Sequence, residues 1–202
     1  VMSLKTRFGN LGNILDFDNL TEENIYVLDS PILTNSQLKK FKKFFSKKTK
    51  EIDCTFDISS SLKDRIEEIR EEAETSVREG STCLILSDKN ISNKKASIPS
   101  ILTVGAVHSH LVKLGLRGYC SLNVECADAL DTHSFAILIG VGATTINPYL
   151  AIDSIYQRYE KKLFGKSDFE SCVVKFKKSI DAGLLKIMSK MGISVISSYS
   201  CL

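Results

Sequence analysis

Apolar and polar positions alternate along the chain in blocks that predict helices followed by strands. In residues 61–79 apolar side chains recur at helical spacing among mostly charged neighbours, namely Leu62, Ile66, Ile69, Ala73 and Val77. Gly80 then stands where a helix commonly ends. The next segment, 82–86, is continuously apolar rather than alternating, which is typical of a parallel strand buried on both faces.

The same reasoning predicts elements along the whole chain. Strands are expected at 25–28, 51–56, 82–86, 120–124 and 143–146. Helices are expected at 34–45, 61–79, 99–114, 134–141, 148–162 and 168–191. The first 24 residues and 88–95 are expected to be loops. A buried strand is the alternative at 134–141, and a break at Gly183 is the alternative within the last helix.

Polar residues at the predicted helix starts support these boundaries. Thr34 and Gln37 have the spacing of a capping box. Asp131 or Thr132 is expected to cap the helix at 134–141, and Asn147 to cap the helix that begins with a proline. The repeated strand–helix order predicts an α/β fold with parallel strands and right-handed crossovers. A partial or complete barrel-like (β/α) architecture and a doubly wound sheet both fit this order.

Composition and charge narrow the class of protein. Hydrophobic residues make up 43% and charged residues 25% of the 202 residues, which is typical of a globular domain with a substantial core. The net charge of +3 is too small to indicate nucleic acid or a membrane surface as a partner. The basic clusters at 39–50 and 161–178 are interpreted as solvent-facing sides of amphipathic helices. Leu84, Ile85, Leu122 and Val124 are predicted core residues.

The six cysteines carry no metal-site spacing. None form a CxxC pair, so we expect reduced thiols that act as small buried hydrophobic residues and hold no iron or zinc. The sequence shows no secretory signal and no long apolar span. A cytoplasmic location is expected, or a plastid in a photosynthetic eukaryote.

The polar motifs favour structural roles over chemistry. His108 and His110 are two residues apart on a predicted helix and cannot share one face to chelate a metal. His133 is assigned to a helix start. Residues 140–142 contain part of a dinucleotide fingerprint, but Thr145 stands where a third small residue is needed, so a tight turn is expected. The acidic runs at 67–68 and 71–72 are expected on a solvated helix face. We therefore predict no catalytic, cofactor-binding or metal-binding residue.

Several stretches, taken together and in order, resemble the central domain of the glutamate synthase large subunit. They are 1–4 (VMSL), 9–13 (GNLGN), 28–34, 105–117, 131–136, 139–151 and 183–194. The resemblance implies that residues 1–182 form the central domain without its amino-terminal part, and that 183–202 begin the connection to the FMN-binding domain. The sequence after Tyr199 departs from the family pattern. Both chain ends are expected to be cuts in a longer polypeptide.

The resemblance also implies a function and partners. The family transfers the amide nitrogen of glutamine to 2-oxoglutarate and reduces the product to glutamate, using FMN and a 3Fe-4S cluster. A structural, ammonia-channelling role follows for this chain, which is expected to bind no cofactor and to be inactive alone. Its partners would be the glutaminase and FMN-binding domains, with a small subunit or ferredoxin reached through the full enzyme. The alternative is an independent barrel-type α/β domain that binds a small phosphorylated or flavin ligand.

The two chain ends are the expected contact surfaces with these domains. Both ends are apolar and carry little charge. The residues assigned to the interdomain, tunnel side are Met2, Ser3, Met188 and Met191. Further apolar residues expected to face solvent at the ends are Leu4, Phe8, Ile193, Val195 and Ile196.

Overall fold

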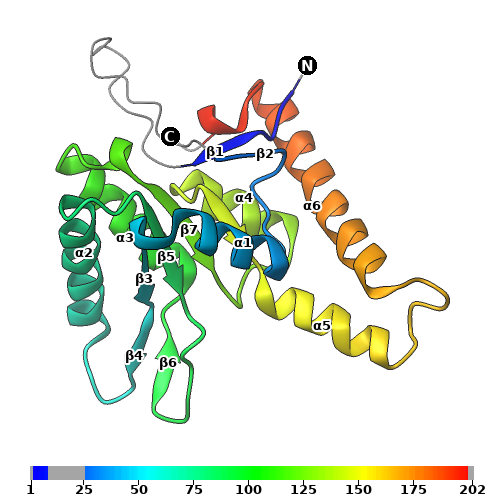
Figure 1. Cartoon of the computed structure of the whole chain (residues 1–202), viewed down its shortest axis with the longest axis horizontal. Helices are drawn as coiled ribbons and strands as arrows, with labels where there is room; N and C mark the ends of the chain where they lie inside the picture. The colour runs from blue at the N-terminus through cyan, green and yellow to red at the C-terminus, as the bar shows by residue number, and fades with distance from the viewer. Residues whose placement is uncertain (1, 9–25, 200–202) are drawn as a thin grey trace.

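The computed structural model describes residues 2–8 and 26–199. Its centre is a four-stranded parallel sheet in the order β3-β5-β7-β8 (Figure 1). The strands are β3 (Thr49–Asp53), β5 (Cys83–Ser87), β7 (Ser121–Glu125) and β8 (Thr145–Asn147). Helices connect successive strands, so the predicted parallel α/β fold is confirmed. Residues 31–33 continue the sheet beyond β8, where the Leu33 N–H donates to the Ile146 carbonyl at 2.8 Å.

Three helices cover one face of the sheet. They are α2 (Leu62–Arg78), α3 (Ser100–Lys113) and α4 (Thr132–Gly140). Every second residue of each strand points to this side, and Leu84, Leu86, Leu122 and Val124 join the main core there. With Ile85 on the other side, all four predicted core residues are buried.

Helix α1 (Asn35–Phe45) covers the opposite face, in front of the sheet in Figure 1. Its apolar stripe, formed by Leu38, Phe41 and Phe45, packs with Cys83 and Ile85 in a second core cluster. The reciprocal capping box is present: Thr34 Oγ1 accepts from the Gln37 N–H at 3.2 Å, and Gln37 Oε1 accepts from the Thr34 N–H at 3.0 Å. A short ribbon of β1 (Thr6–Phe8) and β2 (Tyr26–Leu28) adds Phe8 to the cluster.

Two long helices extend from the carboxyl end of β8. Helix α5 (Tyr149–Glu160) leads outward, and α6 (Phe169–Met191) returns to pack against α4 (Figure 1). Helix α6 runs through Gly183 without a break. A Cβ at Gly183 would lie 2.5 Å from Thr132 Cγ2, so glycine allows the close approach of α4 and α6.

Several local predictions are wrong. The expected strand at 51–56 is two strands, because the chain leaves the sheet after β3 and β4 (Thr55–Asp57) pairs antiparallel with β6 (Lys95–Ser97). The expected loop at 1–24 contains β1 within residues 2–8, and its residues 9–24 lie outside the described part of the chain; the expected loop at 88–95 contains the start of β6. Asn147 caps no helix; it ends β8, and its amide donates to the Leu33 carbonyl at 2.9 Å. Short 3-10 turns occupy Ser46–Lys48, Arg117–Tyr119 and Ile196–Ser198.

Candidate functional site

Polar side chains gather where the parallel strands end. Ser87, Glu125 and Asn147 close β5, β7 and β8 and are paired in register, so their side chains emerge on the same face. In barrel-like α/β proteins this carboxyl edge is where reacting groups are held. The carboxyl edge of the sheet is therefore the candidate functional site.

Glu125 is the centre of an ion-pair cluster. Its side chain is only 3% exposed and accepts from Lys89 Nζ at 2.5 Å and Ser87 Oγ at 3.0 Å, while Lys42 Nζ of α1 lies 3.4 Å away. Burial alone would raise the pKa of Glu125, but the Lys89 hydrogen bond and the two ammonium charges hold it below its ordinary value. A carboxylate held ionised in this way is a weak base, and the cluster ties α1 to the sheet.

Two buried acceptor atoms at the same edge have no hydrogen-bond partner among the described residues, Asp88 Oδ1 and Asn147 Oδ1. The other oxygen of Asp88 accepts from the Ala127 N–H at 3.0 Å. Burial and the Asp88 carboxylate raise the pKa of Tyr149, whose ring lies 5.0 Å below Lys89 Nζ. The edge thus holds an ordered charge network.

Replacing Glu125 by glutamine is expected to destabilise the chain by about 2 kcal/mol at neutral pH, because a buried charged acceptor is lost. The folded pKa of Glu125 lies below 4.5, so its contribution is present above that pH and is lost as the pH falls through the lowered value. Urea midpoints measured across the acid range should therefore converge for the two proteins. Glu51→Gln is the control, since Glu51 is an exposed partner of Lys42 and should change stability little. Parallel curves for native chain and Glu125→Gln would contradict this account.

His108 and His110 contact different residues, as predicted for two side chains that do not share one face of the helix. His110 Nε2 is 2.8 Å from Glu74 Oε2 of α2, whereas His108 Nδ1 accepts from Arg117 Nε at 3.1 Å. Burial and the Arg117 guanidinium lower the pKa of His108. His133 is exposed at the start of α4, whose N-cap is Asp131.

Arg117 is a structural residue that the sequence reasoning missed. Its guanidinium donates to the Cys120 carbonyl at 2.6 Å and to the Gly142 carbonyl at 2.9 Å. It thereby joins the start of β7 to the turn at 140–142, which is the predicted tight turn between α4 and β8. An arginine just before a buried strand was the only local signal for this role.

The remaining motifs have the expected surroundings. Arg65–Glu68 and Arg70–Glu67 form salt bridges of 2.8 and 2.6 Å on the exposed side of α2. The cysteines within the described ranges are buried and unpaired: Cys54, Cys83, Cys120, Cys126 and Cys172. Burial raises the pKa of Cys54 to about 12, as expected of an unreactive thiol. Cys201 lies outside the described residues.

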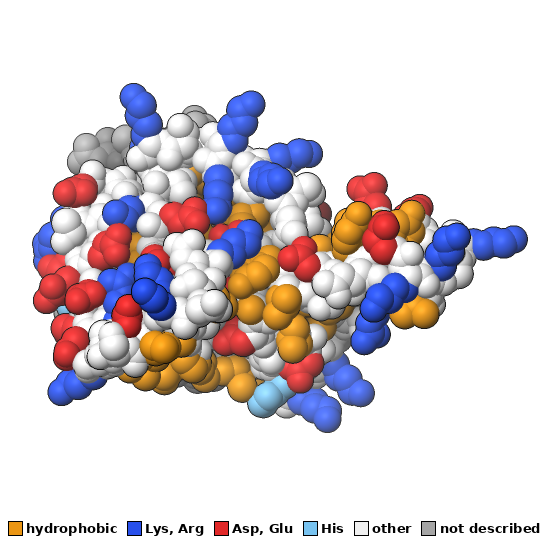
Figure 2. Space-filling model, turned by 90° about the horizontal axis from the view of Figure 1, so that it is seen from below, with side chains coloured by type: hydrophobic (Ala, Val, Ile, Leu, Met, Phe, Trp, Pro, Cys, Tyr) orange, Lys and Arg blue, Asp and Glu red, His pale blue; other side chains and the backbone are white. Residues whose placement is uncertain are grey.

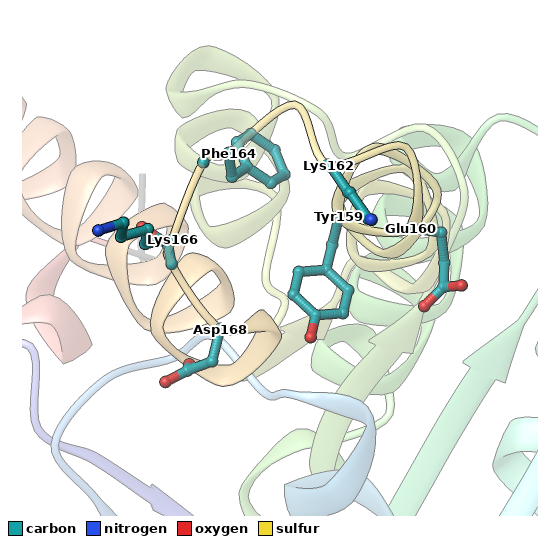
Figure 3. A pocket seen from close by; sticks show the side chains of 8 residues that line it. Tyr159, Glu160, Lys162, Phe164, Lys166 and Asp168 are labelled. Atoms are coloured by element: carbon teal, nitrogen blue, oxygen red, sulfur yellow. The ribbon is translucent and has the colours of Figure 1, made fainter.

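A hollow of about 430 Å³ lies at the turn between α5 and α6. Figure 3 shows Lys166 and Glu160 pointing away from each other across it. The Asp168 side chain caps the start of α6, where its Oδ1 accepts from the Ser171 N–H at 2.6 Å. The polar groups of this hollow do not converge on one point, so it offers no arrangement for catalysis.

The two chain ends pair with each other. The Ser3 N–H donates to the Ser194 carbonyl at 2.8 Å, and the Ile196 N–H donates to the Ser3 carbonyl at 3.0 Å. Met2 and Met191 are exposed as expected, and Val195 is too, while Ile193 is partly buried. The expected exposure of four other residues is wrong, because their side chains are buried: Leu4, Phe8, Met188 and Ile196.

No helix among the described residues has the length and apolar character needed to cross a bilayer. Groups of three or more acidic, histidine or cysteine side chains suited to a metal ion are likewise not found in that part of the chain.

Comparison with solved structures supports the barrel-like fold. A mutant flavocytochrome b2 with benzoylformate matches with a TM-score of 0.55 at 12% identity, covering 82% of this chain and 36% of that one. A second mutant with pyruvate bound gives 0.51 at 14% identity, covering 93% and 42%. At such low identity the likeness shows the fold alone, and the chain corresponds to part of a barrel.

Sequence comparison is more specific. The chain is 51% identical over 202 residues to the glutamate synthase [NADPH] large chain of Azospirillum brasilense, covering 98% of this chain and 13% of that protein. It is 39% identical over 214 residues to the ferredoxin-dependent glutamate synthase of Pyropia yezoensis, covering 98% and 14%. The family model for the glutamate synthase central domain matches residues 1–202. The chain therefore belongs to the glutamate synthase central domain family.

Proposed function

We propose that the chain is a structural, ammonia-channelling domain of a glutamate synthase that makes L-glutamate from glutamine and 2-oxoglutarate. The carrying observation is the family match over residues 1–202. The relatives are much longer, since the chain spans only 13% of the Azospirillum brasilense protein. The glutaminase and FMN-binding domains would be the neighbours of this domain in one polypeptide. FMN and the 3Fe-4S cluster would be held by those other parts, and a small subunit or ferredoxin would reach the domain only through the full enzyme.

The carboxyl edge of the sheet supports a scaffold role. At the edge where a barrel enzyme exposes reacting groups, this chain engages Glu125 with Lys89, Ser87 and Lys42 of α1. A carboxylate with a lowered pKa and three partners stabilises structure rather than accepting a proton from a substrate.

The chain ends support a contact with neighbouring domains. Because Ser3 pairs with the segment after α6, both ends reach one surface, where Met2 and Met191 are exposed. We assign Met2, Ser3, Met188 and Met191 to the interdomain, tunnel side, where Met188 is the buried member of the set. Exposed thioether side chains adapt well to an apolar interface.

A second apolar surface lies at the face where the strands end. Figure 2 looks onto this face and shows hydrophobic side chains reaching the surface in its middle and along its lower margin. Exposed residues of the loops and helix starts here are Ile101, Leu102, Leu130 and Leu150. The Ser100 N–H donates to Asp128 Oδ2 at 2.9 Å, which holds the start of α3 beside the loop that carries Leu130. Such surfaces favour burial by another domain.

The cellular location of this chain would be that of the complete enzyme, which is the cytoplasm, or a plastid in a photosynthetic eukaryote.

The purified chain is expected to hydrolyse no glutamine and to form no glutamate, because the reacting groups are assigned to other domains. Its visible spectrum should show no flavin band. Glutamine turnover above a buffer blank would contradict the proposed role. A stoichiometric flavin band would instead favour an independent barrel-type domain that binds a flavin or phosphorylated ligand.

A further inference from the structure

A groove of about 980 Å³ runs between the first turn of α1, the helix α5 and the helix α6. Its size matches the sites that proteins use for small molecules. It is separate from the chain ends and from the Glu125 cluster, and the proposed function does not use it.

The groove has an apolar wall made by two helices. Ile152 of α5 and Val173 of α6 are nearly buried beneath it, while Tyr156 and Val174 remain exposed along it. Tyr156 meets Phe169 edge to face, with ring centroids 5.4 Å apart, which fixes the aromatic part of the wall. An apolar body of a few carbon atoms would gain by covering these side chains.

Four lysines line the groove, and Lys177 is set apart because it is half-buried whereas Lys39, Lys40 and Lys178 are exposed. Lys177 is half-buried, and its Nζ donates to Gln37 Oε1 at 3.5 Å, an oxygen that the Thr34 N–H already occupies at 3.0 Å. Within residues 2–8 and 26–199, Lys177 forms no salt bridge, and the nearby Asp181 accepts from Ser30 Oγ at 2.7 Å. Burial lowers the pKa of Lys177 although Asp181 and Asp29 raise it. A carboxylate beside this ammonium would replace the hydration that it has lost.

The first turn of α1 adds to this preference. Thr34, Asn35 and Ser36 line the groove, and the first turn carries no acidic side chain. The positive end of the helix dipole therefore acts beside Lys177, on the same side of the groove. Four carboxylates also line the groove, and they disfavour a second negative charge on the ligand: Asp29, Asp153, Glu170 and Asp181.

We propose that this groove binds a small amphipathic monocarboxylate. The carboxylate would contact Lys177 and the first turn of α1, and the apolar body would lie on Ile152, Val173 and Tyr156. The class is set by the half-buried Lys177 at one end of the groove and the apolar wall at the other. Dianions and purely polar acids fit less well, because they leave the wall uncovered or meet the acidic rim.

Calorimetric titration of the chain with phenylbutyrate tests the proposal, with neutral phenylbutanamide as the matched ligand. We expect phenylbutyrate to bind about tenfold or more tightly than the amide, the effect of one charge-assisted hydrogen bond. Lys177→Gln should weaken phenylbutyrate by a similar factor and leave the amide unchanged. Lys175→Gln is the control on the same helix, since Lys175 is exposed and outside the groove.

Thermal melts of both variants establish that they fold. Val174→Asp provides a second test that leaves Lys177 in place, and it should weaken both ligands. The proposal is overturned if phenylbutyrate does not bind, if the amide binds equally well, or if Lys177→Gln and Lys175→Gln give the same affinity.

Discussion

Replacing Gly142 by alanine is expected to lower the free energy of unfolding by about 3–5 kcal/mol. Two costs add at this position. Gly142 has φ +115°, a conformation that non-glycine residues adopt at about 1–3 kcal/mol. A Cβ would also come within 2.2 Å of His108 Nδ1, so the imidazole and the Arg117 contact must shift. Urea denaturation measures the loss.

A second glycine separates the two costs. Gly80 has φ +95° but no atom within 4 Å of its added Cβ, so Gly80→Ala should show the backbone cost alone. In a His108→Ala background, Gly142→Ala should recover the part of the steric cost that comes from the imidazole, but its loss should stay above the Gly80→Ala value because the Cβ of residue 108 remains at 2.9 Å. Equal losses for Gly142→Ala and Gly80→Ala in the native background would show that the close contact with His108 is wrong.

Replacing Leu122 by alanine is expected to cost about 2–5 kcal/mol, because a fully buried side chain is removed from the middle of the sheet. Leu122 lies on β7 opposite Leu84 and faces the helices α2, α3 and α4, so the surrounding side chains can close the cavity only in part. The free energy of unfolding from denaturant melts gives the value.

Leu150→Ala is the matched control for this deletion. Leu150 is 44% exposed at the start of α5, and losing the same atoms there should change stability by less than about 0.5 kcal/mol. Similar losses of unfolding free energy for Leu122→Ala and Leu150→Ala would contradict the placement of β7 at the centre of the core.

The sequence predicts well those features that depend on neighbouring residues. The capping box of Thr34 and Gln37 needs only four consecutive residues, and it is present. The strand at 82–86 could be recognised because both of its faces are buried and its apolar run is uninterrupted. The order of such segments was sufficient to predict a parallel α/β fold.

Features that depend on distant residues could not be predicted in this way. Asn147 has the local pattern of an N-cap, but its amide is used by Leu33, which lies 114 positions earlier. The terminal segments look like exposed ends in the sequence, yet Leu4 and Ile196 are buried because the two ends pair. The charge cluster of Glu125 joins α1, β5 and β7, and none of these pairings has a sequence pattern of its own.

The most direct test of the central claim is the coupling of ammonia release to glutamate formation in the complete glutamate synthase that carries this domain. Met191→Trp places a larger side chain on the surface that we assign to the tunnel side. We expect more glutamine to be hydrolysed for each glutamate formed, because ammonia escapes where the domains no longer fit. Val112→Trp is the control, an exposed site in the last turn of α3. The assignment of the chain ends to the ammonia route is wrong if the ratio of glutamine hydrolysed to glutamate formed is unchanged in Met191→Trp. It is also wrong if this ratio rises equally in Val112→Trp.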